Sequence, residues 1–164
     1  MAFKTGGSIV IDRPLEQVWA WLNDEQHELI WRRPYLKELH RTGPYAVGTR
    51  FEGINQGGGK VDHFIDEVTE YRPPVRIAWR QITRAANVPR AGSYTLEPQD
   101  GRTKFTLDIE IAFTGIARAL EPLMSVMAKN MLGPKILKQL KEAIEQEGLE
   151  AGPVGRSVTE STAK

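Results

Sequence analysis

The residues with the clearest potential for chemistry are His63 and the nearby carboxylates Asp62 and Asp66. A histidine near carboxylates can act as a general acid or base, or can hydrogen-bond a ligand, when it faces a cavity. In an apolar cavity the same three groups would form a site with tuned acidity. The plainer interpretation is a charged, solvated strand face. If the site is catalytic, His63 is the candidate for its acid or base.

The direction of the His63 side chain depends on the register of its strand. Two alternations compete: Val61, His63 and Ile65 share one face, and Phe64, Asp66 and Val68 share the other. Neither alternation stays regular through Glu67, which predicts a β-bulge between Ile65 and Val68. We favour an outward or rim position for His63.

Other catalytic and metal-binding patterns are missing from the sequence. The three histidines are dispersed without HxH or HExxH spacing, and the chain has no cysteine. We therefore expect no metal and no cofactor. No serine lies in a GxSxG turn. Gly57-Gly58-Gly59 lies between two predicted strands, which favours a hairpin over a phosphate-binding loop.

Three of the four methionines lie on one stripe of a predicted C-terminal helix: Met124, Met127 and Met131. The methionine side chain is unbranched and polarizable, so it can repack around irregular shapes. The stripe is either the lid of a cavity or ordinary helix core. The apolar face continues through Leu137, Leu140 and Ile144.

Four aromatic residues are candidates for contact with a flat, apolar ligand. Trp31 and Tyr35 precede the second strand, where they either cap a ligand or pack at a rim. Trp79 and Tyr94 lie on apolar faces of two later strands, as cavity wall or as core. Gly92 shares the face of Tyr94 and leaves room that a side chain would fill.

Residue patterns predict a strand, two short helices, six more strands and a long helix. Pro14 suits the first turn of the first helix, and Asp100-Gly101 predicts a tight hairpin. Gly133-Pro134 predicts a kink in the long helix, and Gly148 predicts its C-cap. The expected strands span 8–11 (extending back to about 3), 35–42, 48–56, 60–71, 75–83, 92–97 and 102–113, and the expected helices about 15–22, 24–31 and 121–147.

The last predicted strand alternates most clearly, with apolar Phe105, Leu107 and Ile109 on one face and polar residues on the other. Such a strand covers a core on one side and meets water on the other. A seven-stranded antiparallel sheet must have its inner face covered. One helix is too narrow to fill the concave side, so we expect a cavity between sheet and helix.

The 164 residues predict one domain over 1–147 and a disordered tail over 148–164, which is rich in small residues. Lys and Arg total 22 against 21 Asp and Glu, so the net charge is +1. With no long basic run, we expect no nucleic-acid partner. The sequence has neither a secretory h-region nor a spanning apolar run. We expect a cytoplasmic protein without stable membrane insertion, as a monomer or a homodimer.

Several segments, in their order along the chain, are similar to one protein family. They are residues 9–19 (IVIDRPLEQVW), 47–51 (VGTRF), 67–74 (EVTEYRPP) with 78–80 (AWR), and 101–107 (GRTKFTL). Over about residues 3–147 the chain resembles the START/polyketide cyclase/birch-pollen-allergen superfamily (SRPBCC), in its polyketide cyclase/dehydrase-like branch. The resemblance implies an α+β helix-grip fold, with a seven-stranded curved antiparallel sheet around a long C-terminal helix and an internal cavity. Members carry lipids, sterols, hormones or polyketides, and a minority catalyse reactions in the same pocket.

We therefore expect binding or transport of one small hydrophobic molecule, such as a lipid or polyketide. The expected sheet wall is Phe51, Trp79, Tyr94, Phe105, Leu107 and Ile109, and the methionines form the lid. The expected polar contacts come from Tyr35, Asn55, Gln81 or His63. One alternative is a polyketide cyclase/dehydrase-type enzyme that uses an acid or base in the pocket. A second is a non-catalytic interaction module with a filled core and an exposed apolar patch.

Overall fold

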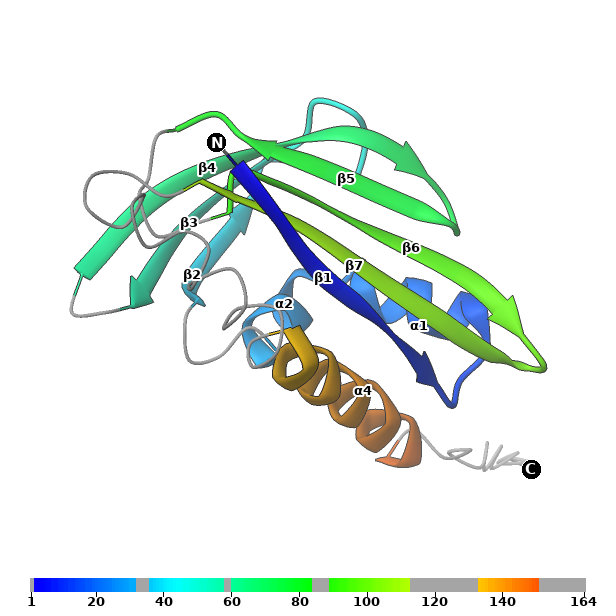
Figure 1. The fold of residues 1–164 in the computed structure, drawn as a ribbon. Coiled ribbons are helices and arrows are strands. Elements are labelled where there is room, and N and C mark those ends of the chain that lie inside the picture. The colour runs from blue at the N-terminus through cyan, green and yellow to red at the C-terminus, as the bar shows by residue number, and fades with distance from the viewer. Residues whose placement is uncertain (1, 32–35, 58–59, 84–88, 113–132, 151–164) are drawn as a thin grey trace, which may run out of the picture.

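The computed structural model describes residues 2–31, 36–57, 60–83, 89–112 and 133–150, and its elements are labelled in Figure 1. The described strands are β1 (Ala2–Ile11), β2 (Leu36–Arg41), β3 (Arg50–Gly57), β4 (Lys60–Arg72), β5 (Arg76–Gln81), β6 (Ala91–Gln99) and β7 (Arg102–Ala112). The described helices are α1 (Leu15–Leu22), α2 (Glu25–Trp31) and α4 (Gly133–Glu150). The predicted α+β helix-grip class is confirmed.

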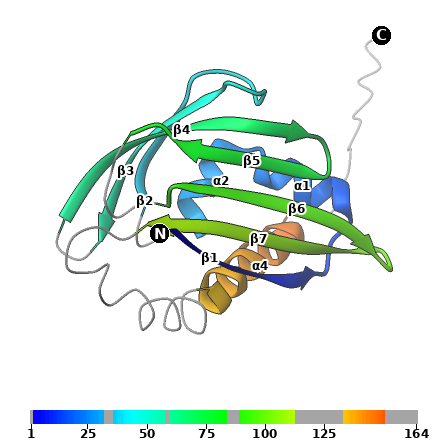
Figure 2. The same ribbon diagram turned by 45° about the horizontal axis from the view of Figure 1, so that its top comes forward.

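All seven strands form one antiparallel sheet in the order β1-β7-β6-β5-β4-β3-β2. The sheet is strongly curved, and the three helices lie on its concave side (Figures 1 and 2). The long β4 strand shifts register against β5 between Val68 and Glu70. A bulge adds local twist and bends its strand, which helps the sheet to curve. The bulge lies beyond the predicted interval between Ile65 and Val68.

The β6–β7 hairpin closes where the sequence predicts. Gln99 pairs with Arg102, so the loop has two residues, Asp100 and Gly101. Both have positive φ, 51° and 76°. This conformation matches the right-handed twist of the two strands, and the Asp-Gly pair adopts it easily.

The two faces of the sheet differ as the alternation predicts. The inner face of β5, β6 and β7 is buried, through Ile77, Trp79, Tyr94, Leu96, Phe105 and Leu107. On the outer face, Glu67 lies between two arginines, 2.9 Å from Arg80 and 3.5 Å from Arg50. The hydrogen bond from Arg80 is the main reason that the pKa of Glu67 lies below its ordinary value. These pairs are solvent-exposed, so they contribute little stability.

Helix α1 buries Val18, Trp21 and Leu22, and Pro14 is its N-cap, one position before the predicted first turn. Helix α4 buries Leu137, Leu140 and Ile144, the continuation of the predicted stripe. α4 packs against β1 and α2, while α1 packs against β6 and β7. Within the described residues, no helix is long and apolar enough to cross a membrane.

The boundaries of α4 differ from the prediction. The helix continues through Gly148 to Glu150, so the predicted C-cap at Gly148 is wrong. A glycine can remain inside a helix at a modest cost when neighbouring turns are well packed. The described helix begins at Gly133, which places Pro134 in its first turn, where proline is tolerated. The predicted kink at Gly133-Pro134 stays untested, because the segment before Gly133 lies outside the described residues.

Polar contacts fasten α4 to the edge strand β1. Lys141 Nζ donates to the carbonyl oxygen of Val10 at 2.8 Å and also pairs with Glu145. Glu145 Oε1 accepts a 2.7 Å hydrogen bond from the backbone N–H of Asp12. An edge strand exposes unpaired backbone groups, and these contacts cover part of that edge. Further along α4, Glu147 accepts from Trp21 Nε1 and lies 3.2 Å from His27 Nε2, which joins the three helices.

The environment of Glu145 predicts an acid-sensitive contribution to stability. Burial raises the pKa of this carboxyl, but hydrogen bonds from Lys141 and Asp12 outweigh burial and leave the pKa below its ordinary value of 4.5. The stabilisation is therefore present above the unfolded-state pKa and is lost as pH falls through the folded-state pKa. We expect wild-type protein to lose more unfolding free energy than Glu145→Gln between about pH 7 and about pH 3.

Urea unfolding at several pH values measures this difference. The matched control is Glu142→Gln, one turn earlier on α4, where an exposed carboxyl lies 3.7 Å from Lys138. The control should follow the wild-type pH curve. Identical curves for wild type and Glu145→Gln would contradict the role given to Glu145.

Candidate functional site

A hollow lies on the concave side of the sheet, over β2 to β6. Its volume is about 360 Å³, counting the part that opens to solvent. Its wall consists of four aromatic residues, three aliphatic residues and one carboxylate: Tyr45, Phe51, Trp79, Tyr94, Leu39, Val68, Ile77 and Asp66. The free space is narrow, because only about 30 Å³ admits the centre of a water molecule, enough for about two waters. A larger molecule at this place therefore requires wall side chains to rotate.

The aromatic side chains of the wall form two contacting pairs, and Phe105 behind the wall extends one of them. The rings of Trp79 and Tyr94 are 4.8 Å apart at an interplanar angle of 55°, and Tyr94 continues to Phe105 at 5.5 Å. Across the hollow, the rings of Tyr45 and Phe51 are 5.2 Å apart. Tilted pairs at these separations are favourable beyond their buried area. The Tyr45 ring also stacks on Tyr71 at 5.8 Å and has the Arg41 guanidinium 4.6 Å from its centroid, so a bound molecule meets mainly the rings of Phe51, Trp79 and Tyr94.

Trp79 owes its position to a glycine on the neighbouring strand. Trp79 pairs with Gly92 across β5 and β6, and a Cβ on Gly92 would lie 2.3 Å from the indole ring. The room predicted beside Tyr94 therefore exists, but the Trp79 ring occupies it. Phe64 occupies the space over Gly53 in the same way, 2.5 Å from the position of an added Cβ.

The polar member of the wall is Asp66, whose exposed fraction is only 5 %. Its neighbours across the sheet are Phe51 on β3 and Gln81 on β5. The Gln81 amide is half-buried and donates from Nε2 to the carbonyl oxygen of Pro89 at 3.4 Å. A carboxylate and a side-chain amide thus lie side by side on two strands, next to the aromatic rings.

The strand of His63 adopts the second of the two predicted alternations. Phe64, Asp66 and Val68 are buried, whereas His63 is exposed on the outer face. Turning Phe64 and Val68 into the core removes more apolar surface from water than turning Val61 and Ile65 inward, because phenylalanine is larger than isoleucine. Val61 is 58 % exposed. The alternative with His63 facing the cavity is therefore wrong.

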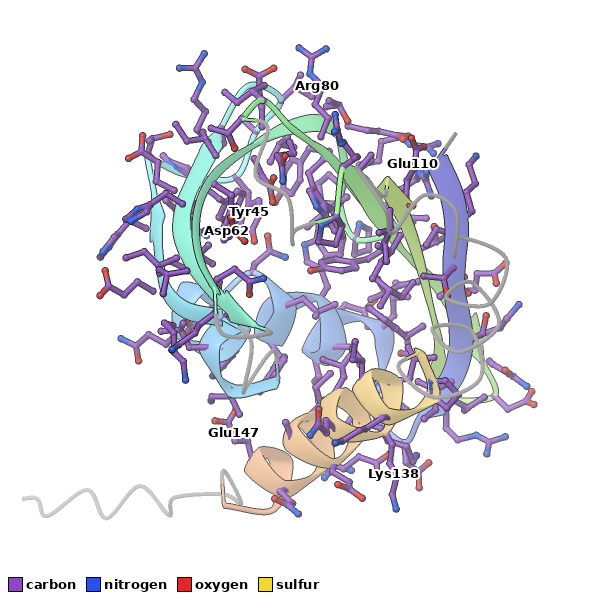
Figure 3. All side chains as sticks on the ribbon, turned by 60° about the vertical axis from the view of Figure 1, so that its left-hand side comes forward. Tyr45, Asp62, Arg80, Glu110, Lys138 and Glu147 are labelled. Atoms are coloured by element: carbon purple, nitrogen blue, oxygen red, sulfur yellow. The ribbon has the colours of Figure 1, made fainter. Side chains whose placement is uncertain are left out.

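The same register turns Asp62 toward the interior. Asp62 is half-buried and pairs with Asn55 on β3, which is also half-buried. Figure 3 shows Asp62 and Tyr45 under the arch of the sheet, whereas Arg80 points away from it. Asn55 thus lies on the cavity side of the sheet with Asp62, further along the strand than the hollow wall.

The structure divides the expected wall into two groups. Phe51, Trp79 and Tyr94 line the hollow, while Phe105 and Leu107 are buried at 0 % and 1 % exposure and are outside its lining. Ile109 is half-buried at the edge of this core and is also outside the lining. Tyr35, Met124, Met127 and Met131 lie outside the described residues, as does the side chain of Trp31.

Five lining residues are absent from the expected wall: Leu39, Tyr45, Asp66, Val68 and Ile77. Tyr45 lies in the connection between β2 and β3, where alternation gives no direction. In the sequence, Asp66 and Val68 belong only to one of two competing strand faces. The signal for the correct face was the larger size of Phe64 compared with Ile65, since each face also carries one valine.

No metal centre is evident in the part of the chain that the structure describes. Within those residues, no three His, Cys, Asp or Glu side chains are grouped so that they could hold a metal ion. The chemistry that this arrangement offers is burial of an apolar molecule against aromatic faces, with one carboxylate to orient it or exchange a proton.

Several solved structures share this fold. The aromatase/cyclase ZhuI from Streptomyces sp. R1128 has a TM-score of 0.73 and 18% identity, over 94% of this chain and 100% of that one. The protein TTHA0849 from Thermus thermophilus has a TM-score of 0.70 and 16% identity, over 88% and 99%. The di-domain ARO/CYC BexL of the BE-7585A biosynthetic pathway has a TM-score of 0.62 and 18% identity, over 88% and 50%.

No curated protein matches the chain by sequence. A family described as polyketide cyclase/dehydrase and lipid transport matches residues 2–145, most of the chain. The curved sheet with helices on its concave side agrees with that match. The hollow is lined by residues of β2 to β6 and of the β2–β3 connection, and not by residues of α1, α2 or α4, so among the described residues the expected cavity between the sheet and the C-terminal helix is not seen. The chain belongs to the polyketide cyclase/dehydrase and lipid transport family.

Proposed function

We propose that the protein binds one small, largely apolar molecule in the hollow on the concave face of the sheet. The observation that carries this proposal is the wall of four aromatic and three aliphatic side chains around a single carboxylate. Solvent-facing loops do not gather such residues, whereas ligand pockets are mostly apolar with a few placed polar groups. Affinity comes mainly from apolar burial, after the cost of ordering the ligand and the wall.

A substitution that fills the hollow should weaken binding without changing the outer surface. Val68, which is 1 % exposed and lines the hollow, is replaced by phenylalanine. We expect Val68→Phe to weaken binding of the neutral fluorescent probe N-phenyl-1-naphthylamine by about tenfold or more, because the added ring occupies the ligand's space. Fluorescence titration of the probe measures the change.

The matched control is the same substitution on the outer face of the same strand. Val61 is 58 % exposed, so Val61→Phe should leave probe affinity unchanged. Circular dichroism and thermal unfolding establish that both variants are folded, and Leu39→Phe replaces Val68→Phe if the latter fails to fold. Equal probe binding by the inner and outer variants would count against a ligand in this hollow.

Asp66 supports a second candidate function, an enzyme of the cyclase/dehydrase type. A buried carboxylate at the wall of an apolar pocket can take a proton from carbon next to a ketone and return it to a departing hydroxyl, which leaves as water. ZhuI, whose fold is similar, is named as an aromatase/cyclase. Mass spectrometry separates the two functions: a carrier returns a β-hydroxy ketone ligand unchanged, while an enzyme returns the α,β-unsaturated ketone, lighter by one water.

A further inference from the structure

The wall of the hollow contains one carboxylate among apolar side chains. Asp66 is 5 % exposed, and the Phe51 ring lies on the neighbouring strand of the same face. The oxygens of an ionised carboxylate only accept hydrogen bonds, and their charge attracts a cation more strongly where water is excluded. A molecule that enters the hollow therefore meets a group that accepts hydrogen bonds and favours positive charge.

A second acceptor lies beside the first. Gln81 is the cross-strand neighbour of Asp66, and its amide oxygen is buried. In the described part of the chain this oxygen accepts no hydrogen bond. A buried acceptor that lacks a donor costs stability, which a ligand with several N–H groups can recover. Neighbouring acceptors on β4 and β5 thus fit a group that donates more than one hydrogen bond.

The rings of the wall add attraction for the same kind of group. Trp79, Tyr94 and Phe51 line the hollow with Asp66. The fourth ring of the wall, Tyr45, already has the Arg41 guanidinium 4.6 Å from its centroid. The face of an aromatic ring carries partial negative charge and attracts a cation, most strongly for tryptophan and when water is excluded. A carboxylate with aromatic faces around it is suited to an ammonium group and unsuited to an anion.

We propose that the ligand of this hollow presents a protonated amine to Asp66, with its apolar body against the aromatic wall. This inference rests on the proposed function, because it names the class of molecule that the same hollow takes. The ammonium donates to the Asp66 carboxylate and the Gln81 amide oxygen. A ligand that ends in a carboxylate is rejected, because two like charges meet in a site with little water.

A series of three ligands with one shared body tests the proposal. The probes are 1-naphthalenemethylamine, 1-naphthalenemethanol and 1-naphthoic acid, each used to displace N-phenyl-1-naphthylamine from the wild-type chain at neutral pH. We expect the amine to bind about tenfold more tightly than the alcohol, and the acid to bind more weakly than both, since charge-assisted hydrogen bonds exceed neutral ones. An alcohol or an acid that equals or exceeds the amine would overturn the proposal.

The substitution Asp66→Asn removes the charge and keeps the shape. We expect the amine to lose its advantage and to bind like the alcohol. The control Asp108→Asn makes the same change at an exposed position on the outer face of β7 and should keep the wild-type order. An amine preference that survives in folded Asp66→Asn would overturn the proposal. If Asp66→Asn fails to fold, the order of affinities of the three ligands for the wild-type protein decides the test.

The design separates this inference from the function on which it rests. If the neutral probe does not bind wild-type protein, the proposal that the hollow binds a ligand is rejected, and the proposal of an amine ligand is rejected with it. If the neutral probe binds and the three naphthalenes show no amine preference, the ligand hollow stands and only the amine is rejected.

Discussion

Replacement of Gly6 by alanine should destabilise the protein by about 3 kcal/mol or more, the upper end of what overpacking costs. A Cβ on Gly6 would lie 1.9 Å from the carbonyl oxygen of Leu107, inside the β1–β7 pairing. This neighbour is backbone, so it cannot rotate away as a side chain could. The clash can be relieved only if β1 separates from β7 near Gly6. This separation would also disturb the packing of α4, because α4 packs on the edge strand β1.

Thermal unfolding measures this effect as a drop in Tm of about 10 °C for a chain of this size. Gly43→Ala is a close control, because Gly43 has φ of 157° against 156° for Gly6 and an added Cβ there would meet nothing within 4 Å. Both variants carry the cost of placing alanine at this φ, but only Gly6→Ala also brings a Cβ against the carbonyl oxygen of Leu107. Similar Tm values for both would show that the close approach to Leu107 does not govern stability.

The strands and the buried faces of most of them were predictable because strand side chains alternate with a period of two. Phe105 and Leu107 face inward in the one strand whose alternation is clean from end to end, and the structure buries both. The hairpin at Asp100-Gly101 was predictable for a different reason: both of its residues tolerate the positive φ that a two-residue turn requires.

The direction of β4 was not predictable from local pattern, because both of its faces carry apolar and charged residues. The register becomes definite only through its neighbours: Phe64 lies over Gly53 on β3, and Asp66 adjoins Gln81 on β5. These pairings join residues far apart along the chain, which alternation within one strand does not reveal. The buried carboxylate of the candidate site was therefore missing from the expected wall, and His63 took its place.

The space beside Tyr94 shows the same limit. A glycine at position 92 predicts room, but only the β5–β6 register reveals that Trp79 occupies it. Whether a glycine opens a cavity or accommodates a large ring depends on its cross-strand partner. The shape of the hollow wall therefore depends on which residues are paired across the strands as well as on which residues the strands contain.

Replacement of Gly92 by alanine should therefore damage both the fold and the hollow. The new Cβ would lie 2.3 Å, 2.8 Å and 2.9 Å from three atoms of the Trp79 indole. The ring is 9 % exposed and packs at 4.8 Å against Tyr94, so it has little room to move aside. We expect a loss of about 2–3 kcal/mol of unfolding free energy, together with weaker binding of N-phenyl-1-naphthylamine as Trp79 is pushed into the hollow.

A double-mutant cycle shows whether the contact with Trp79 is the cause. Trp79→Leu removes the indole, so adding Gly92→Ala in that background should cost much less than in wild type. We expect an interaction free energy of about 0.5–3 kcal/mol, the range for residues in direct contact, from urea unfolding of the four proteins. Additive effects would place the cost of Gly92→Ala in the backbone of β6, and Trp79 would then owe its position to packing against Tyr94. Strong coupling would instead mean that one glycine on β6 fixes the largest side chain of the hollow wall, and with it the shape that a ligand meets.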